Sequence, residues 1–254
     1  HAQAFDKMTT DITLHRRTRL APDGQSGTNG GNMRSAKGRV AGVVLAGGLS
    51  SRMGVDKAGL RLPEIGSPGI DGADAPDLLS AACALVRSVL PVCLVSCRAD
   101  APRPGHDCVF DALPGQGPAA GLQAALRRAE ELGYAALLAL SCDLPLMNAA
   151  TLRRLLEARD AAPPQTLVTA YRARNTGRVE SLTAIYEVAA LPYFDAALAR
   201  GERKLGLMVP GDLRHFVDYG PEEDEPFFNC NCPADLEQAR ILLAQKNARF
   251  AEKG

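Results

Sequence analysis

The stretch VAGVVLAGGLSSRMGVDK, residues 40–57, decides the fold class. Its first part, residues 40–46, is short, apolar and rich in valine, which is typical of a buried parallel strand. Gly47 and Gly48 follow at once, and glycines let backbone N–H groups approach a bound anion closely. The stretch therefore predicts an α/β domain that binds a ligand where its first strand ends.

Apolar periodicity outside this stretch extends the pattern. In the first half we predict strands at 92–97 and 135–140, and helices at 78–89, at 118–132 and after Asn148. In the second half we predict strands at 166–171, 181–186 and 214–219, and helices at 188–200 and 233–245. The alternation of strand and helix in the first half predicts a mostly parallel central sheet with helices on both faces.

Composition limits the class of protein. The chain has 254 residues, of which 46% are hydrophobic, and its 29 basic and 29 acidic residues balance. Such a neutral chain favours neither a nucleic-acid partner nor a membrane surface. No apolar run approaches the roughly 20 residues that cross a bilayer. The 7 cysteines are odd in number and scattered, which indicates reduced thiols, and we expect a cytoplasmic protein without a secretory leader.

The first 37 residues differ from the rest. They are polar, have no sustained apolar period and start with His1 instead of a methionine. We interpret residues 1–37 as a disordered extension or a remnant of expression, attached to a single domain over residues 38–250.

Side chains on the first loop suit a phosphate ligand. Ser50, Ser51, Arg52 and Lys57 add hydrogen-bond donors and positive charge where a triphosphate would lie. Neither the dinucleotide fingerprint G-x-G-x-x-G nor the Walker pattern G-x-x-x-x-G-K-[ST] is present. The alternative is a tight turn followed by a solvated basic loop.

Two further motifs contain an aspartate that suits a ligand site. The segment LSCDLP, residues 140–145, places Asp143 at the end of a buried strand, where one carboxylate can hold Mg²⁺ together with substrate phosphates. The segment DALPGQGPAAG, residues 111–121, opens a helix whose N-terminal amides favour an anion. Taken singly, Asp143 can equally be a turn cap, and the second segment a flexible loop.

Together these segments resemble the MobA family of molybdenum cofactor guanylyltransferases. The motifs L-A-G-G-x-S-x-R-M-G-x-D-K, D-x-x-P-G-x-G-P-x-A-G-L, C-D-L-P and a late N-x-N-x-P-x-D-L occur in the family's order over residues 40–240. The resemblance implies a Rossmann-like three-layer nucleotidyltransferase fold. It also implies transfer of GMP from GTP to the phosphate of molybdenum-bearing molybdopterin, with Mg²⁺ as cofactor.

The resemblance also implies roles for single residues. By position in the motifs, the guanine and ribose are bound by Leu45, Ala46, Gly47 and Gly48, phosphate by Lys57, the nucleotide by Asp111, Mg²⁺ by Asp143, and the pterin by Asn229 and Asn231. Arg52 and Lys57 would act with Asp143 as a catalytic electrostatic clamp. Molybdopterin-transfer proteins and molybdoenzyme chaperones would be partners.

The chain departs from the family at several points. The family usually has threonine before the proline of the last motif, where this chain has Cys232. The loop at 63–76 is long, and the asparagine expected after the second strand is replaced by either Ser96 or Arg98. Residues 179–181 read Val-Glu-Ser where some members have His-Pro-Thr.

Two other functions stay open. The same fold transfers CMP to molybdopterin or nucleotides to sugar phosphates in other members of the superfamily. The pair Gly47 and Gly48 favours guanine, because the cytidylyl relatives resemble L-A-A-G there. A non-enzymatic nucleotide-binding module is the third reading, and the presence of Lys57 and Asp143 counts against it.

Overall fold

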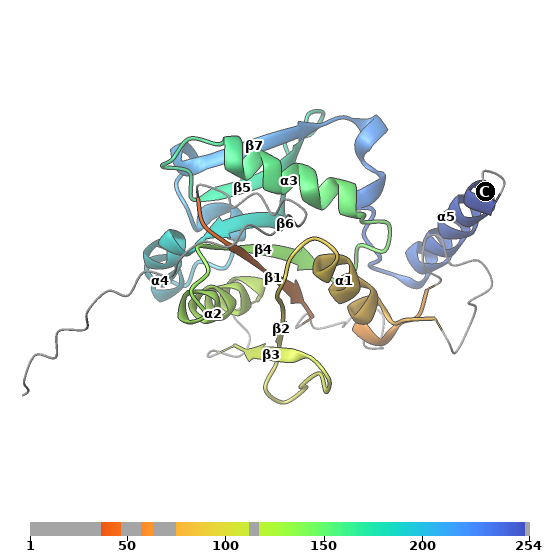
Figure 1. Cartoon of the computed structure of the whole chain (residues 1–254), viewed down its shortest axis with the longest axis horizontal. Helices are drawn as coiled ribbons and strands as arrows, with labels where there is room; N and C mark the ends of the chain where they lie inside the picture. Colours follow the sequence, from red (N-terminus) through yellow and green to blue (C-terminus); the bar gives the residue numbers. More distant parts are fainter. Residues whose placement is uncertain (1–36, 47–56, 63–74, 112–116, 252–254) are drawn as a thin grey trace, which may run out of the picture. The chain divides into compact units, whose positions relative to one another are not determined.

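A single mixed sheet organises the domain, shown in Figure 1. The computed structural model describes residues 37–46, 57–62, 75–111 and 117–251, all within one compact unit. The strands of this part of the chain are β1 (Val40–Leu45), β2 (Cys93–Cys97), β3 (Asp107–Phe110), β4 (Ala136–Ser141), β5 (Val168–Ala173), β6 (Val179–Glu187) and β7 (Arg214–Tyr219). Their order in the sheet is β3-β2-β1-β4-β6-β5-β7.

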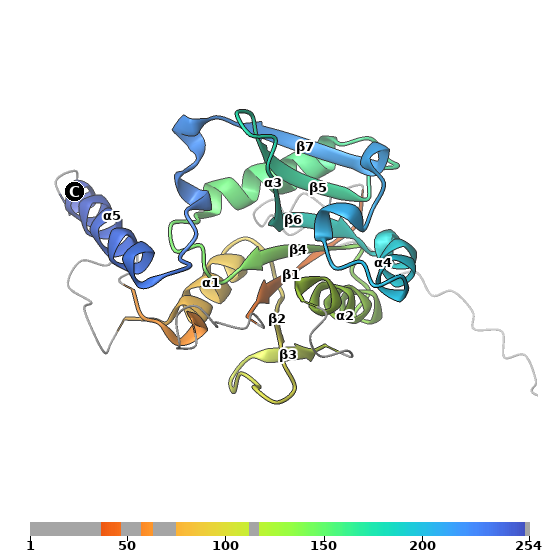
Figure 2. The same ribbon diagram turned by 180° about the vertical axis from the view of Figure 1, so that it is seen from behind.

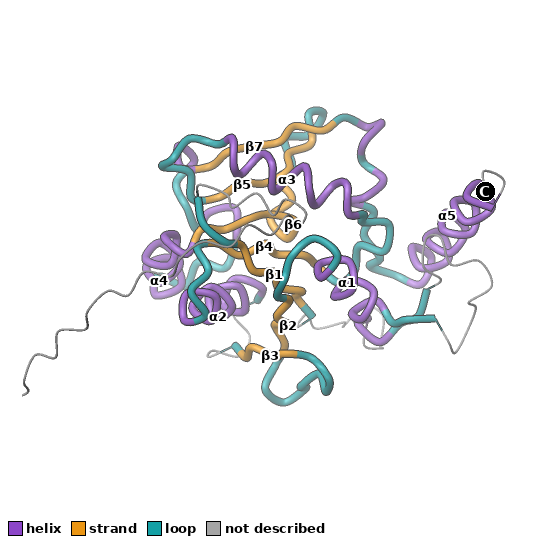
Figure 3. Tube along the Cα trace, viewed as in Figure 1, coloured by secondary structure: helices purple, strands orange, loops and turns teal. Residues whose placement is uncertain are grey.

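Helices lie on both faces of the sheet. On these faces lie α1 (Leu78–Arg87), α2 (Pro118–Glu131), α3 (Ala149–Ala161) and α4 (Leu191–Ala199), whereas α5 (Pro233–Ala251) lies beside the sheet. Short 3-10 turns include η1 (Lys57–Gly59), η3 (Val188–Ala190) and η7 (Glu225–Phe227). Figure 1 looks onto the face with α1 and α3, and Figure 2 onto the face with α2 and α4. Figure 3 shows the same arrangement with the strands in orange and the helices in purple. The predicted three-layer α/β fold is confirmed.

Strand direction places most strand ends on one edge. β1 pairs in parallel with β2 and β4, and β2 pairs in parallel with β3. β6 is antiparallel to β4 and to β5, so it begins at the edge where β4 and β5 end. β7 is parallel to β5 and ends there as well. We call this side of the sheet the carboxyl edge.

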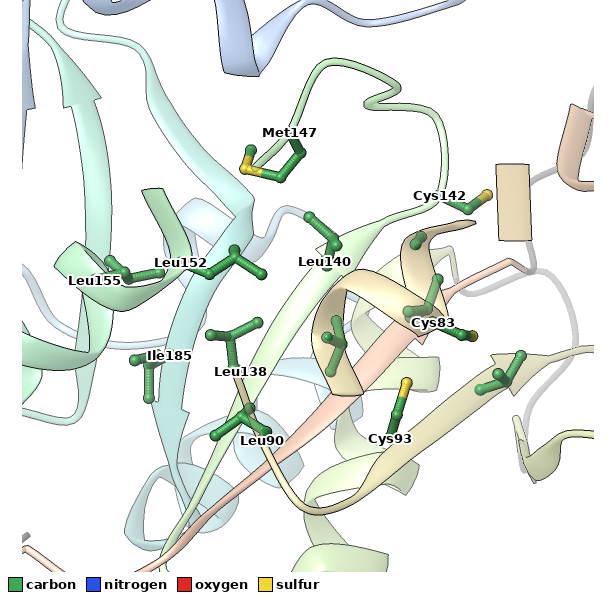
Figure 4. Packing of buried hydrophobic residues seen from close by; sticks show 14 of the residues in the cluster. Cys83, Leu90, Cys93, Leu138, Leu140, Cys142, Met147, Leu152, Leu155 and Ile185 are labelled. Carbon is green, nitrogen blue, oxygen red and sulfur yellow. The ribbon is translucent and has the colours of Figure 1, made fainter. Parts of the chain in front are cut away.

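Burial explains why these segments are strands. Every residue of β1, β2 and β4 is buried, as expected for strands covered on both faces. Alternate side chains enter two cores. One lies under α1 and α3 and contains Leu138 and Leu140 of β4 with Leu152 and Leu155 of α3, as Figure 4 shows. Each fully buried leucine of this kind contributes about 1.5–3 kcal/mol.

The second core lies under α2 and α4. Leu122 and Leu126 of α2 pack there with Leu137 of β4 and Phe194 of α4. A third, smaller cluster joins α5 to the rest of the domain through Leu62, Leu78, Leu146, Cys230, Ala239 and Leu243.

Capping residues set the helix ends. Asn148 accepts a hydrogen bond from the Thr151 amide at 2.9 Å, which confirms it as the N-cap of α3. The helix predicted at 188–200 is a turn of 3-10 helix followed by α4. Gly201 comes directly after it with a φ of 77°, in the left-handed region that suits glycine at a helix end.

Four elements differ from the predictions, and one of them, β5, is displaced from 166–171 to Val168–Ala173. β3 was not predicted, because its four residues are only partly buried and include Asp107. β6 starts at Val179, earlier than residue 181, and runs against the direction of β4. α5 continues to Ala251, past residue 245, because residues 246–251 contain neither glycine nor proline.

All cysteines of the chain are free thiols, as predicted. Within the described part of the chain, no helix is both long enough and apolar enough for a transmembrane span. The boundary predicted at residue 37 falls where the description begins, so the interpretation of residues 1–37 stays a prediction.

Candidate functional site

Three of the sequence motifs meet at the carboxyl edge of the sheet. Leu45 ends β1 and Ser141 ends β4, and these two residues are partners in the parallel register. The pairing continues beyond the strands. The Ala46 amide donates to the Ser96 carbonyl at 2.9 Å, and the Cys142 amide donates to the Leu45 carbonyl at 3.4 Å. The start of the glycine-rich loop is therefore fixed beside Asp143.

Asp143 is held by the strand that precedes it. The Ser141 hydroxyl donates to Asp143 Oδ1 at 2.5 Å, and Ser141 itself is only 8% exposed. This bond orients the carboxylate and leaves its second oxygen for another partner. Sequence reasoning missed Ser141, although a hydroxyl two residues before a carboxylate at a strand end is a readable signal, since a short side chain there can reach the carboxylate across the turn.

Asp111 follows β3 at the same edge. Its Oδ1 is buried and has no hydrogen-bond partner among the described residues, and burial raises the pKa of this carboxyl. A buried acceptor of this kind is costly unless a ligand donates to it. The geometry thus leaves Asp111 able to accept a hydrogen bond from a bound molecule.

Gly121 lets α2 approach these strand ends. A Cβ atom at this position would lie 2.3 Å from Ser96 Oγ and 2.7 Å from Asp111 Oδ1, both far below van der Waals contact. The first turn of α2 can therefore pack against Ser96 and Asp111 only with glycine there. Ser96 is buried at the end of β2, whereas Arg98 pairs with Asp100 on the surface at 2.8 Å. Of the two replacements considered for the family asparagine, only Ser96 faces this site.

The N-terminus of α2 follows a glycine and carries no side-chain cap among the residues that the structure describes. Gly117 is the N-cap. Pro118 begins the helix without an N–H group of its own, so the amides of the following residues remain as donors. These amides and the positive end of the helix dipole favour an anion, as the sequence predicts.

The last motif lies against Asp143 as well. The Cys230 amide donates to the Asp143 carbonyl at 2.9 Å, and the Cys230 side chain is buried. Asn229 and Asn231 flank this buried residue, and both are exposed. The two asparagines thus lie on either side of a backbone amide that is hydrogen-bonded to the Asp143 loop.

The start of β6 adds a polar cluster to the edge. Tyr219 Oη donates to Glu180 Oε1 at 2.6 Å, and Arg178 Nε donates to the same oxygen at 2.8 Å. Glu180 stands where some members of the family have proline, so this cluster belongs to the part of the edge in which the chain departs from the motifs.

A single carboxylate such as that of Asp143 is a donor that suits Mg²⁺. Among the described residues, no three His, Cys, Asp or Glu side chains are grouped so that they could enclose an ion. Mg²⁺ is bound in this way by one or two carboxylates, with substrate phosphates and water completing the shell. Asp143 Oδ2 is the oxygen that would hold it.

Several predicted site residues cannot be placed. Gly47, Gly48 and Arg52 lie outside the described residues. Lys57 begins η1, and only its backbone is described. The structure thus brings together Leu45, Ala46, Asp111, Asp143, Asn229 and Asn231 at one edge, and the roles assigned to all these residues stay predictions.

Comparison with known proteins identifies the family. A family model described as the MobA-like NTP transferase domain matches residues 42–210. The chain is 32% identical to the molybdenum cofactor guanylyltransferase of Rhodobacter capsulatus over 211 residues, which is 82% of this chain and 98% of the relative. It is 33% identical to the protein of the same name from Rhizobium johnstonii, over 82% of this chain and 94% of the relative.

A solved structure shares the fold. It is the molybdopterin-guanine dinucleotide biosynthesis protein A of Archaeoglobus fulgidus, with a TM-score of 0.62 and 22% identity over 81% of this chain and 99% of that one. The family match spans the strands, helices and loops that build the first three motifs of the site. The chain belongs to the MobA-like NTP transferase family.

Proposed function

We propose that the protein transfers GMP from GTP to the phosphate of molybdenum-bearing molybdopterin and releases pyrophosphate. The observation that carries this proposal is the hydrogen bond between the Cys230 amide and the Asp143 carbonyl. It joins the loop of the predicted metal ligand to the loop of the predicted pterin ligands. The names of the relatives support the choice of substrates.

The nucleotide half of the site lies between β1 and α2. Backbone groups of Leu45 and Ala46 would contact guanine and ribose, and Asp111 Oδ1 would accept a hydrogen bond from the nucleotide. The N-terminus of α2 offers amides to an anion. Gly47, Gly48, Arg52 and Lys57 complete this half in the proposal, as the family motif implies.

The chemistry requires no side-chain base. The nucleophile is an anionic phosphate oxygen of the acceptor, which attacks the α-phosphorus of GTP while the bond to pyrophosphate breaks. The protein must align the two substrates and neutralise the charge on the phosphates. Mg²⁺ at Asp143, when bound, supplies most of that neutralisation, and Lys57 and Arg52 are proposed to add to it.

Nucleotide selection tests the proposal. The protein is incubated with Mg²⁺, molybdenum-bearing molybdopterin and either GTP or CTP, and released pyrophosphate is measured. We expect release of pyrophosphate with GTP and not with CTP. A preference for CTP would instead indicate a cytidylyltransferase, and tight GTP binding without release would indicate a nucleotide-binding module that is not an enzyme.

The proposed reaction also implies the substrates, the protein partners and the cellular location. GTP and molybdenum-bearing molybdopterin are the direct partners. Proteins that deliver molybdopterin and chaperones that pass the product to molybdoenzymes are the further partners we propose, and the cytoplasm is the proposed location.

Ser141→Ala is expected to weaken Mg²⁺ binding about tenfold, since the loss of a group that orients a metal ligand typically has an effect of this size. The variant removes the hydroxyl that holds Asp143 Oδ1. The measurement is a titration of the GTP-bound protein with Mn²⁺ as a paramagnetic probe. Ser88→Ala is the matched control, because that exposed hydroxyl donates to the Leu85 carbonyl at the end of α1. Equal affinities in the two variants would contradict the role of Ser141.

A further inference from the structure

The carboxylate of Asp235 fixes the segment that carries the predicted pterin ligands. Asp235 is the third residue of α5, and its Oδ2 accepts hydrogen bonds from two backbone amides that precede the helix. These are the Asn231 amide at 2.7 Å and the Cys232 amide at 2.9 Å. A single carboxylate oxygen thus fixes the backbone at Asn231 and Cys232, shortly after Asn229.

A second contact fixes the other end of the segment. Cys230 is 1% exposed and packs in the small cluster with Leu146 and Leu243, and its amide is bonded to the Asp143 carbonyl. The segment 229–232 is therefore held at Cys230 by the Asp143 loop and at Asn231 by Asp235. These two contacts restrain the backbone that carries the exposed side chains of Asn229 and Asn231.

Asp235 is the aspartate of the N-x-N-x-P-x-D-L motif, and the cysteine before the proline of that motif makes this carboxylate more important in this chain. The residue before Pro233 occupies the N-cap position of α5, and a threonine there would accept a hydrogen bond from an amide of the first turn. Cys232 offers only a sulfur, which is a weak acceptor. The Asp235 carboxylate is therefore the strong acceptor at this helix start.

We propose that Asp235 is a positioning residue for the acceptor substrate. By holding the Asn231 amide it presents Asn229 and Asn231 beside Asp143, so that its loss lowers the affinity for molybdopterin. This inference rests on the proposed function, because it takes the two asparagines as pterin ligands. The competing explanation is that Asp235 only stabilises the start of α5.

The Asp235→Ala variant separates the two explanations by a KM measurement. We expect the KM for molybdopterin to rise about tenfold, as for the loss of a hydrogen bond to a charged group, while the KM for GTP changes less than about twofold. Asp235→Asn keeps one acceptor oxygen and is expected to restore much of the affinity. Asp77→Ala is the matched control, since Asp77 accepts from the Ser80 amide at 2.7 Å as the cap of α1. That control should lower the melting temperature and leave the KM for molybdopterin unchanged.

A second variant makes the test independent of stability. Cys232→Thr in the Asp235→Ala background supplies a hydroxyl cap to α5 but gives no partner to the Asn231 amide. We expect the melting temperature to recover and the KM for molybdopterin to stay high. Recovery of both quantities, or an unchanged KM in Asp235→Ala itself, would overturn the proposal. Failure of the proposed function is distinguishable, because the unmodified protein would then release no pyrophosphate with GTP and molybdopterin.

Discussion

Asp143→Ala should reduce pyrophosphate release by about 10²–10³-fold, which is the order of effect seen when a preorganised electrostatic group is removed from a site of charge development. Asp143 is the carboxylate at the end of β4, and its Oδ2 is the oxygen proposed to hold Mg²⁺. The fold should survive the change, because the side chain is partly exposed and belongs to neither main core.

Three measurements define the outcome for Asp143. Single-turnover release of pyrophosphate gives the loss of rate, a Mn²⁺ titration gives the loss of metal binding, and thermal unfolding shows that the protein is folded. Asp143→Asn is the matched variant, because the amide oxygen can still accept the hydrogen bond of Ser141 while the negative charge is gone. Full activity in either variant would show that Asp143 is not the metal ligand.

Arg159→Ala should destabilise the fold by about 3–5 kcal/mol, the usual effect of breaking a buried ion pair by removing one partner. The Arg159 side chain is fully buried on α3 and binds Glu187 through two bonds, of 2.7 and 2.9 Å. The same guanidinium donates to the Gly38 carbonyl at 3.1 Å and to the Lys37 carbonyl at 2.9 Å. Without it, a carboxylate that is only 14% exposed and two carbonyls lose their partner.

Thermal unfolding tests this expectation. A loss of 3–5 kcal/mol corresponds to a melting temperature lower by roughly 10 °C in a domain of this size. The matched control is Arg128→Ala, whose exposed partner Glu131 lies at 2.9 Å, and exposed pairs of this kind contribute about 0–1 kcal/mol. Equal unfolding temperatures for the two variants would refute the argument.

The location of Arg159 separates its effect from catalysis. Glu187 ends β6 and pairs with Ala136 at the start of β4, which is the edge opposite to the site. The KM values for GTP and molybdopterin should therefore be unchanged in the folded fraction of Arg159→Ala. Replacing both partners, as Arg159→Met with Glu187→Leu, should recover most of the stability, because no charge is then left unpaired.

Much of the fold could be predicted because its central strands are buried on both faces. β1, β2 and β4 appear in the sequence as short apolar runs, and the caps Asn148 and Gly201 mark helix ends by their residue types. β3 could not be found in this way, since its apolar run, Cys108 to Phe110, is only three residues long and half exposed at the edge of the sheet. The direction of β6 also leaves no trace in the hydrophobic pattern, because parallel and antiparallel neighbours bury the same side chains.

The candidate site was predictable where one motif contains both its strand and its ligand. Asp143 was found because it follows a predicted strand, and Asp111 because it begins the glycine-rich segment that opens a predicted helix. The bonds from Ser141 and Asp235 depend on side-chain orientation, and the bond between Cys230 and Asp143 depends on tertiary packing between distant parts of the chain. Spacing in the sequence contains no information about such contacts.

The bond between Cys230 and Asp143 also bears on the order in which the protein is assembled during synthesis. It closes a loop that includes β5, β6, β7 and α4, and closing so long a loop early costs entropy that few contacts yet offset. The strands that form the nucleotide half all leave the ribosome before residue 229 does. A nascent chain can therefore form the proposed nucleotide half first, and the proposed acceptor half is complete only once the last helix has been made.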